Sequence, residues 1–319
     1  MHRRFRCIVK VTRVAAIDCG TNSIRLLIAD IGQDPTRLVD VVRRMEIVRL
    51  GEGIDKAGRF AAEALGRTFA AVDDYAAEIR HHGAGRVRFV ATSATRDAAN
   101  RSVFIDGVKD RLGVSPEVVS GDEEAALSFV GATRDLGAVV GGARHLVVDI
   151  GGGSTEFVMG YPQTGIDGVA SVDVGCVRMA ERHFRNDPPF PAEVAAARDD
   201  IDAAIRRVAL TLPLRRAETL LGLAGSVTTV AALALGMWEY DPQRIHHARI
   251  TAADIHRVCE ELLYSTHEKR AANPAIHPGR LDVIAAGALI LSAVVAYTGV
   301  PEVLVSEHDI LDGIAWSLG

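Results

Sequence analysis

Two short motifs of the form Asp-x-Gly-x-x-Ser carry residues suited to chemistry in this sequence. They read D-C-G-T-N-S at residues 18–23 and D-I-G-G-G-S at residues 149–154. Glycines allow a positive φ and a close approach of the backbone to a ligand, so successive N–H groups can surround an anion. Ser23 or Ser154 could donate a further hydrogen bond. The pair of motifs favours phosphate binding, although Asp and Gly are also common in ordinary hairpin turns.

Three carboxylates in or beside these motifs, Asp18, Asp149 and Glu156, are candidate ligands of a metal ion. Mg²⁺ commonly binds one or two carboxylates together with the oxygens of a phosphate. An aspartate at the end of a strand offers such an oxygen beside the turn. The sequence therefore predicts a site that Mg²⁺ and a phosphate share.

A third motif, S-G-D-E-E-A at residues 120–125, lies between an expected strand and an apolar helix. Ser120 with Glu123 three residues later, or Asp122 alone, would cap the helix. The simplest interpretation of Glu123 and Glu124 is that they complement the helix dipole in the first turn. The functional interpretation is that one of them points into the cleft as a general base. The helix dipole would help to keep that carboxylate ionised, and burial would raise its pKa toward neutral pH. The spacing does not decide which one points inward.

Two further segments follow expected strands. Arg96 in A-T-S-A-T-R-D is expected in a loop, where it could bind a phosphate bidentately or form a surface salt bridge with Asp97 or with a helix. The segment A-G-S-V-T-T, residues 224–229, begins a helix whose N-terminus is a natural anion site, although its glycine could simply permit the turn.

The two Asp-x-Gly-x-x-Ser motifs also organise the chain, because residues 18 and 149 stand 131 positions apart and each motif joins two apolar runs. This pattern predicts two hairpins and two related α/β domains facing each other. We expect an N-terminal extension over 1–12, a first domain over 13–136 and a second over 137–319, with the boundary near 135–142. Other expected strands are 38–50, 87–91, 115–120, 168–174, 219–223 and 303–306; expected helices are 61–81, 101–112 and 191–209; residues 265–280 are expected to form a loop.

Composition limits the classes of protein. The 319 residues are 48% hydrophobic and 24% charged, typical of a globular chain. With 36 basic against 41 acidic residues, the net charge of −5 argues against a nucleic-acid binder. The four cysteines show no paired or metal-like spacing, and the basic N-terminus lacks the features of a signal peptide, so a cytoplasmic protein is expected. The apolar stretch 283–300 is interpreted as a buried helix, not a membrane span, and could also serve a homodimer interface.

Taken together, the motifs resemble those of the exopolyphosphatase and guanosine pentaphosphate phosphohydrolase family. The resemblance covers nearly the whole chain from Val14 onward. It rests on D-C-G-T-N-S, M-E-I-V-R-L-G-E-G-I-D (45–55), A-T-S-A-T-R-D-A (91–98), S-G-D-E-E-A, D-I-G-G-G-S-T-E, V-G-C-V-R-M (174–179), A-G-S-V-T-T and D-V-I-A-A-G-A-L (282–289). It implies two RNase-H-like α/β domains of the actin/hexokinase/chaperone-ATPase type with an interdomain cleft.

The resemblance also implies roles for particular residues. Glu124 would be the general base and Arg96 a phosphate-contacting arginine. Asp149 and Glu156 fall where the family places its metal-linked carboxylates. The implied phosphate cradle comprises Asp149, Gly151, Gly152, Gly153 and Ser154, with Asn22 and Ser23 on the opposite side.

Two departures from the family pattern bear on the substrate. Leu311 stands where many members have an arginine, and the chain ends at Gly319 without the helical extension of long members. The expected activity is Mg²⁺-dependent release of terminal phosphate from inorganic polyphosphate. The alternatives are hydrolysis of the 5′-terminal phosphate of guanosine pentaphosphate, a non-catalytic sensor of polyphosphate or an alarmone, and an ATP-using sugar kinase of the same fold superfamily.

Overall fold

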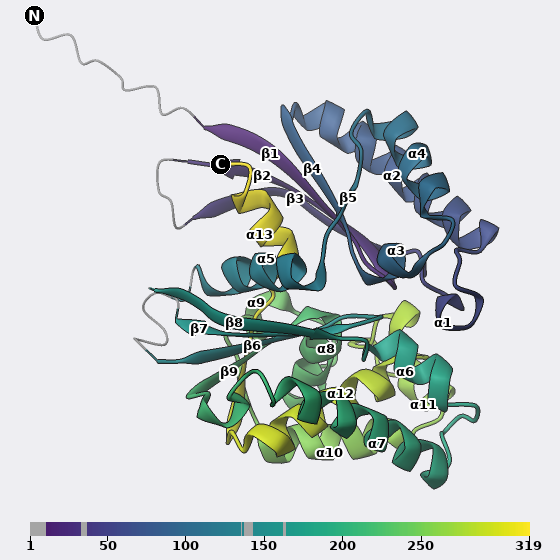
Figure 1. The fold of residues 1–319 in the computed structure, drawn as a ribbon, viewed down its shortest axis with the longest axis vertical. Coiled ribbons are helices and arrows are strands. Elements are labelled where there is room, and N and C mark those ends of the chain that lie inside the picture. Colours follow the sequence, from purple (N-terminus) through teal and green to yellow (C-terminus); the bar gives the residue numbers. More distant parts are fainter. Residues whose placement is uncertain (1–10, 33–36, 135, 137–142, 162–163) are drawn as a thin grey trace, which may run out of the picture.

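The computed structural model describes residues 11–32, 37–134, 136, 143–161 and 164–319. Figure 1 shows two α/β halves, one above the other, each built around a mixed sheet. The first half contains the N-terminal part of the chain. The second half contains most of the remainder, and the C-terminal helix returns to the first.

The first sheet has five strands in the order β3-β2-β1-β4-β5. β1 and β2 form the first predicted hairpin, β2 and β3 are also antiparallel, and β4 and β5 continue the sheet in parallel. A period-2 pattern of apolar residues buries one side of these strands against helices. The strands span Thr12–Cys19 (β1), Ser23–Ile31 (β2), Leu38–Ile47 (β3), Arg86–Ala91 (β4) and Glu117–Val118 (β5).

Helices α2 and α4 cover the face of the first sheet that points away from the second half (Figure 1). The alanine-rich face of α2 contributes Ala71, Val72 and Tyr75 to an apolar core that also includes Phe89 and Phe104. The expected helices over 61–81 and 101–112 are therefore confirmed. The helices of this half are Ile54–Ala57 (α1), Ala62–His82 (α2), Ser93–Asp97 (α3) and Arg101–Leu112 (α4).

The second sheet repeats the arrangement with one strand more, in the order β10-β11-β9-β6-β7-β8. β6, β7 and β8 are antiparallel neighbours, while β9 runs parallel to β6 and β11 parallel to β9. The second predicted hairpin is β6–β7. The strands span His145–Ile150 (β6), Thr155–Tyr161 (β7), Gly165–Val172 (β8), Thr219–Leu223 (β9), Arg249–Thr251 (β10) and Glu302–Val305 (β11).

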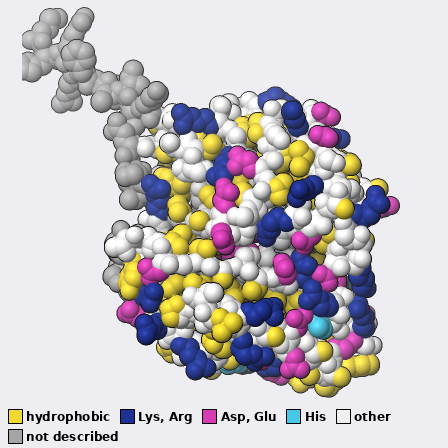
Figure 2. All heavy atoms as spheres, viewed as in Figure 1, with side chains coloured by type: hydrophobic (Ala, Val, Ile, Leu, Met, Phe, Trp, Pro, Cys, Tyr) yellow, Lys and Arg dark blue, Asp and Glu magenta, His cyan; other side chains and the backbone are white. Residues whose placement is uncertain are grey.

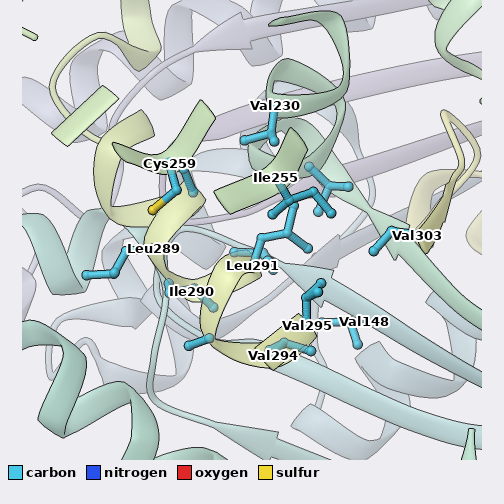
Figure 3. Close-up of a cluster of buried hydrophobic side chains, with 14 of the residues drawn as sticks. Val148, Val230, Ile255, Cys259, Leu289, Ile290, Leu291, Val294, Val295 and Val303 are labelled. Atoms are coloured by element: carbon cyan, nitrogen blue, oxygen red, sulfur yellow. The ribbon is translucent and has the colours of Figure 1, made fainter. Parts of the chain in front are cut away.

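The largest apolar core lies between the second sheet and its helices. Figure 3 shows Leu291 and Val295 of α12 in the cluster with Val148 of β6 and Ile255 of α10. The apolar stretch predicted as a buried helix is thus a core helix. The helices are Cys176–His183 (α6), Pro191–Val208 (α7), Ala224–Ala234 (α8), Pro242–Ile245 (α9), Ala252–Leu263 (α10), His267–Ala271 (α11) and Ile284–Thr298 (α12), with 3₁₀ turns Leu214–Arg216 and Pro278–Arg280.

Two helices each follow a strand of one sheet and pack on the other sheet. α5 (Gly121–Thr133) follows β5 of the first sheet, yet it packs on the second sheet through Ala125 and Phe129. α13 (Ile310–Trp316) follows β11 of the second sheet, yet Ile310 and Ile314 pack on the first. The two helices touch each other between the sheets (Figure 1). The crossing of these two helices joins the halves beside both Asp-x-Gly-x-x-Ser turns, where Glu124 of α5 and Ile310 of α13 line one cavity with them.

The structure differs from the sequence-based expectation in several segments. Residues 265–280, predicted as a loop, contain the helix α11 and a 3₁₀ turn. Thr266 caps α11 through its side chain, a local signal that the prolines nearby obscured. Most of the expected boundary at 135–142 and residues 1–10 lie outside the described residues.

Charged side chains are spread over the surface of both halves on the face in Figure 2. On the face in Figure 2, basic and acidic side chains are interspersed over both halves and do not gather by sign. Within the described ranges, no helix is both long and apolar enough to cross a membrane.

Candidate active site

A cavity of about 70 Å³ lies where the two Asp-x-Gly-x-x-Ser turns face each other. The first turn connects β1 to β2, and the second connects β6 to β7. Both halves and both helices, α5 and α13, contribute to the wall. Among the lining residues are Asp18, Thr21, Asn22, Ser23, Arg25, Ser93, Glu124, Asp149, Gly151, Gly152, Gly225 and Arg280. The structure therefore brings most of the predicted site residues together. The predicted residues outside the cavity lining are Arg96, which contacts Glu124, Gly153 and Ser154 of the second turn, and Glu156 of β7.

The backbone of the second turn is fixed from one side by the first turn of α6. The carbonyl of Gly151 accepts from Cys176 N at 3.0 Å, and that of Gly152 accepts from Val177 N at 2.9 Å. The Gly153 carbonyl accepts from Arg178 Nε at 2.8 Å. Because these peptide bonds are trans, each N–H that follows a held carbonyl points the opposite way. The N–H groups of residues 152, 153 and 154 are thus directed away from α6.

The first turn is held in the same manner by the segment after β3. The Thr21 carbonyl accepts from Gly51 N at 2.8 Å, and the Asn22 carbonyl accepts from Arg49 N at 2.8 Å. The N–H groups of Asn22 and Ser23 therefore point away from that segment. The Asn22 side chain is buried, and its Nδ2 has no hydrogen-bond partner in the described part of the chain. A buried donor without a partner is costly unless a ligand accepts from it.

The glycines of the second turn permit contact between the two turns. A side chain at Gly153 would lie 2.7 Å from Ser93 Oγ and 2.8 Å from Thr21 Oγ1. At Gly152 it would lie 2.9 Å from the Thr21 Cβ. These positions require glycine because the first half closes directly onto the turn.

Glu124 is the glutamate of the S-G-D-E-E-A motif that points inward. Ser120 Oγ accepts from Glu123 N at 3.2 Å, which confirms the predicted cap. Glu123 turns to the surface and pairs with Arg88 at 2.8 Å. Glu124 is 8% exposed, and its Oε2 accepts from Arg96 Nη1 at 2.8 Å.

Burial raises the pKa of Glu124 to about 7, against the opposing attraction of Arg96. The charges of Asp149 and Asp18 add to the increase. Arg96 lies on the short helix α3 and not in a loop as predicted. Of the ion-pair partners considered, it pairs with a helix, through Glu124 of α5, and not with Asp97. A carboxylate with this pKa can gain and lose a proton near neutral pH.

Asp149 and Asp18 occupy equivalent strand ends, but their environments differ. Asp149 Oδ2 accepts from Ser128 Oγ of α5 at 2.7 Å, and burial raises the pKa of Asp149 to about 6. Asp18 Oδ2 accepts from Arg25 Nη2 at 2.6 Å, and burial raises the pKa of Asp18 despite that arginine. Arg25 also donates through Nη1 to Asp309, which caps α13. One arginine thus lies between two buried carboxylates from different halves.

Glu156 is fully buried behind the second turn. Its Oε1 accepts from Ser171 Oγ at 2.8 Å, and burial together with the charges of Glu124 and Asp149 raises its pKa well above the usual value. The hydroxyl of Ser154 faces the same carboxylate and partly offsets this increase in pKa. Glu156 Oε2 and Asp18 Oδ1 are buried acceptors without a hydrogen-bond partner among the described residues.

No three His, Cys, Asp or Glu side chains within the described ranges form a ready-made metal cage. The donor set nevertheless fits a hard cation that brings its own oxygen ligands. Among the described residues, the cations that pair with Asp18 and Glu124 are Arg25 and Arg96, and one oxygen each of Asp18 and Glu156 lacks a hydrogen-bond partner. Mg²⁺ keeps several waters and needs only one or two carboxylates. Asp18, Asp149 and Glu156 remain the candidate ligands.

Sequence reasoning missed Arg25, Ser128, Asp309 and Arg280, all of which lie at the site. The repeat contained a signal for Arg25. In the second hairpin Asp149 pairs across the strands with Glu156, and in the first hairpin Asp18 pairs with Arg25 at the equivalent position. The other residues approach only through tertiary structure.

A second cavity, of about 410 Å³, adjoins the first and shares Arg25, Ala224, Gly225 and Arg280 with it. The Arg280 guanidinium packs on Gly225, where any side chain would overlap it. Leu311 also lines this space, although it is 1% exposed and packs in the apolar cluster beneath α13. The leucine that departs from the family pattern is therefore a core residue here.

Two facing glycine-containing turns, a buried glutamate beside an arginine and a cluster of carboxylates fit a two-domain α/β protein that acts on phosphate groups. The chain belongs to the Ppx/GppA phosphatase family, whose match spans residues 27–317. The expected fold of two RNase-H-like domains of the actin/hexokinase/chaperone-ATPase type is confirmed.

Individual relatives cover nearly the whole chain. Exopolyphosphatase 2 of Mycobacterium tuberculosis is 49% identical over 319 residues, which is 97% of this chain and 99% of that protein. The crystal structure of an exopolyphosphatase-like protein is 43% identical with a TM-score of 0.91, covering 95% of this chain and 98% of that one. The Ppx/GppA enzyme of Aquifex aeolicus is 29% identical with a TM-score of 0.80, covering 97% and 100%.

Proposed function

We propose that this protein is an exopolyphosphatase that releases the terminal phosphate of inorganic polyphosphate by hydrolysis. The observation that carries the proposal is the position of Glu124, buried beside two turns in which the N–H groups of Asn22, Ser23 and residues 152–154 point away from the segments that hold the turns. The 49% identity to an exopolyphosphatase across the whole chain supports the same substrate class.

In the proposed mechanism, Glu124 accepts a proton from a water molecule as the water oxygen attacks the terminal phosphorus atom. The bond from phosphorus to the bridging oxygen breaks, and the shortened polyphosphate leaves with that oxygen. Arg96 occupies Glu124 Oε2, so Oε1 is available to the water. A general base of this kind contributes about 10²–10⁴-fold to the rate.

The two turns bind and orient the terminal phosphate. Backbone N–H groups of residues 152–154 on one side and of Asn22 and Ser23 on the other donate to its oxygens, joined by Asn22 Nδ2. Such donors are preorganised because α6 and the segment after β3 hold the carbonyls on their far side. Preorganised donors stabilise charge that develops in the transition state without reorganising.

Asp18, Asp149 and Glu156 would hold Mg²⁺. The partnerless oxygens of Asp18 and Glu156 and the raised pKa values of all three carboxyl groups provide the physical reason. When bound, the ion would neutralise phosphate oxygens and the crowded carboxylates. The bound ion would also reduce the electrostatic repulsion between a polyanionic substrate and a chain whose net charge is −5.

A direct test measures inorganic phosphate released from polyphosphate of defined length with Mg²⁺, comparing the wild type with Glu124→Gln. We expect turnover in the wild type and a loss of at least about 100-fold in the variant. Tight binding of polyphosphate without turnover would instead identify a sensor. ATP consumption that depends on an acceptor alcohol would identify a kinase.

Hydrolysis of guanosine pentaphosphate is the second candidate, and the adjoining cavity favours it. This cavity is lined by aromatic, apolar and cationic side chains, which suit a nucleoside and its phosphates. They are Tyr240, His277, Met45, Arg43 and Arg280. Comparing kcat/KM for polyphosphate and for guanosine pentaphosphate on one preparation distinguishes the two substrates.

A further inference from the structure

The motif V-G-C-V-R-M contains one side chain that contacts both halves of the molecule at once. Arg178 lies in the first turn of α6 and is 10% exposed. Its Nε donates to the Gly153 carbonyl at 2.8 Å. Its Nη1 donates to Asp55 at 2.6 Å and its Nη2 to Asp97 at 2.5 Å, both in the first half.

We infer that Arg178 is a positioning residue that couples the orientation of the second phosphate turn to closure of the first half over it. The inference rests on the proposed function, because it assigns the control of that same site. None of the three contacts touches the substrate position directly, so Arg178 acts through the groups it holds.

One link concerns the turn itself. The backbone N of Arg178 also donates to the Gly152 carbonyl at 3.1 Å, so this residue hydrogen-bonds to two successive peptide groups of the turn. Because those peptides are trans, the two hydrogen bonds fix the direction in which the N–H groups of Gly153 and Ser154 point. Without the side chain, the Gly153 peptide loses the contact that orients the Ser154 N–H.

The other link concerns the general base. Asp97, which Arg178 holds, directly follows Arg96 on α3, and Arg96 holds Glu124. Closure of the first half therefore places Arg96 against Glu124 and Asp97 against Arg178 together. The same movement seats Ser93 against Gly153, where the turn has no side chain to obstruct it.

The chemistry requires arginine at this position. A guanidinium presents five N–H donors in a rigid plane and can satisfy a carbonyl and two carboxylates in different directions. A lysine could hold one or two of these partners from a single nitrogen. Separation of the halves would deprive Arg178 of both carboxylates and leave its side chain with the Gly153 carbonyl alone among these three partners, so an open form would hold the turn less firmly.

Arg182, one turn later on α6, provides a matched control. It also bridges the halves, since its Nη2 donates to Asp55 at 3.1 Å, and its Nη1 donates to Asp200 at 2.8 Å. Among the described residues, the hydrogen-bond and ion-pair partners of the Arg182 side chain include neither the turn nor Asp97. Loss of Arg182 therefore removes an interdomain ion pair while leaving the proposed coupling intact.

The experiment compares Arg178→Met, Arg178→Lys, Asp97→Asn and Arg182→Met, using polyphosphate of defined length and Mg²⁺. We expect Arg178→Met to lower kcat by about 10–100-fold, the usual effect of misplaced reacting groups, with a smaller change in KM. Arg178→Lys should recover part of this loss, and Arg182→Met should stay within about threefold of the wild type. In a double-mutant cycle, the effects of Arg178→Met and Asp97→Asn on kcat should be less than additive.

Closure has a readout that is independent of turnover. Small-angle scattering should give a larger radius of gyration for Arg178→Met than for Arg182→Met. The two variants should have the same melting temperature, which shows that both are folded. If the wild type hydrolyses neither candidate substrate but this difference remains, the proposed function fails and the coupling stands. The coupling is overturned if Arg178→Met matches Arg182→Met in both kcat and radius of gyration. If Arg178→Met does not fold, Arg178→Lys and Asp97→Asn decide by the same criteria.

Discussion

Arg96 Nη1 lies 2.8 Å from Glu124 Oε2 and also donates to the carbonyl of Val119, which precedes the helix carrying that glutamate. The arginine comes from the helix after β4, and the glutamate from the first turn of α5, which crosses to the second sheet. The pair therefore fixes a titratable carboxylate at the junction of the two halves, in the cavity that both Asp-x-Gly-x-x-Ser turns line.

Replacing Glu124 by Gln should reduce phosphate release by about 10²–10⁴-fold, because the amide cannot accept the proton of water. The matched control is Glu123→Gln, which alters the neighbouring carboxylate on the surface and should stay within about twofold of the wild type. Steady-state release of phosphate checks both variants. Equal losses in the two would remove Glu124 from the mechanism.

The pH dependence of kcat/KM should report the same carboxylate. Because the pKa of Glu124 is about 7 and the ionised form is the base, activity should fall as the pH decreases below about 7. The Arg96→Met substitution removes the attraction that lowers this pKa, so the acid limb should move to higher pH. A profile recorded at fixed Mg²⁺ for each protein tests this, and an unmoved limb in the variant would contradict it.

Glu124→Gln should also stabilise the metal-free protein at alkaline pH. The pKa of this carboxyl is about 7 when folded and near 4.5 when unfolded, so folding loses stability as the pH rises from about 4.5 to 7. The neutral amide avoids that loss, which amounts to roughly 1–3 kcal/mol. Denaturant unfolding at pH 8 and pH 5 in a chelator measures it. The gain should be largest at pH 8 and much smaller at pH 5.

The local part of this site could be predicted from sequence. Strand–turn–strand patterns 131 residues apart predict both hairpins because a period of two and a glycine turn are local properties. Ser120 and Glu123 likewise predict the start of α5. The choice between Glu123 and Glu124 was not local, since neighbours on a helix point about 100° apart and packing decides which one faces inward.

The long-range part could not be predicted in this way. Asp309 meets Arg25 across 284 positions of sequence, and only the return of α13 to the first sheet brings them together. Arg96 was expected in a loop because the five residues of α3 are too few to show a helical period. Arg280 reaches the cavity by lying on Gly225, a contact that no spacing encodes.

Mg²⁺ should raise the melting temperature of the wild type, because a ligand that binds only the folded state adds about 2.7 kcal/mol at 100 times its Kd. Asp18→Asn and Glu156→Gln each remove a partnerless carboxylate oxygen, so both should diminish this increase. Glu63→Gln, an exposed change in α2, is the control and should retain it. Scanning fluorimetry with and without Mg²⁺ gives the comparison. An undiminished increase in both site variants would place the ion elsewhere.

Gly313→Ala should destabilise the protein by about 1–3 kcal/mol or more, because α5 and α13 cross with their backbones in contact. An added methyl group at Gly313 would overlap the carbonyl of Leu127, and one at Gly131 would overlap the carbonyl of Asp309. Gly66→Ala is the matched control, since Gly66 lies in α2 with open space around it and alanine favours a helix. Denaturant unfolding should show changes in the free energy of unfolding of opposite sign for the two substitutions.

Because Asp309 caps α13 and holds Arg25, Gly313→Ala should also lower kcat/KM in the folded fraction. Stability and kcat/KM unchanged from the wild type would show that the crossing can relax without disturbing the site.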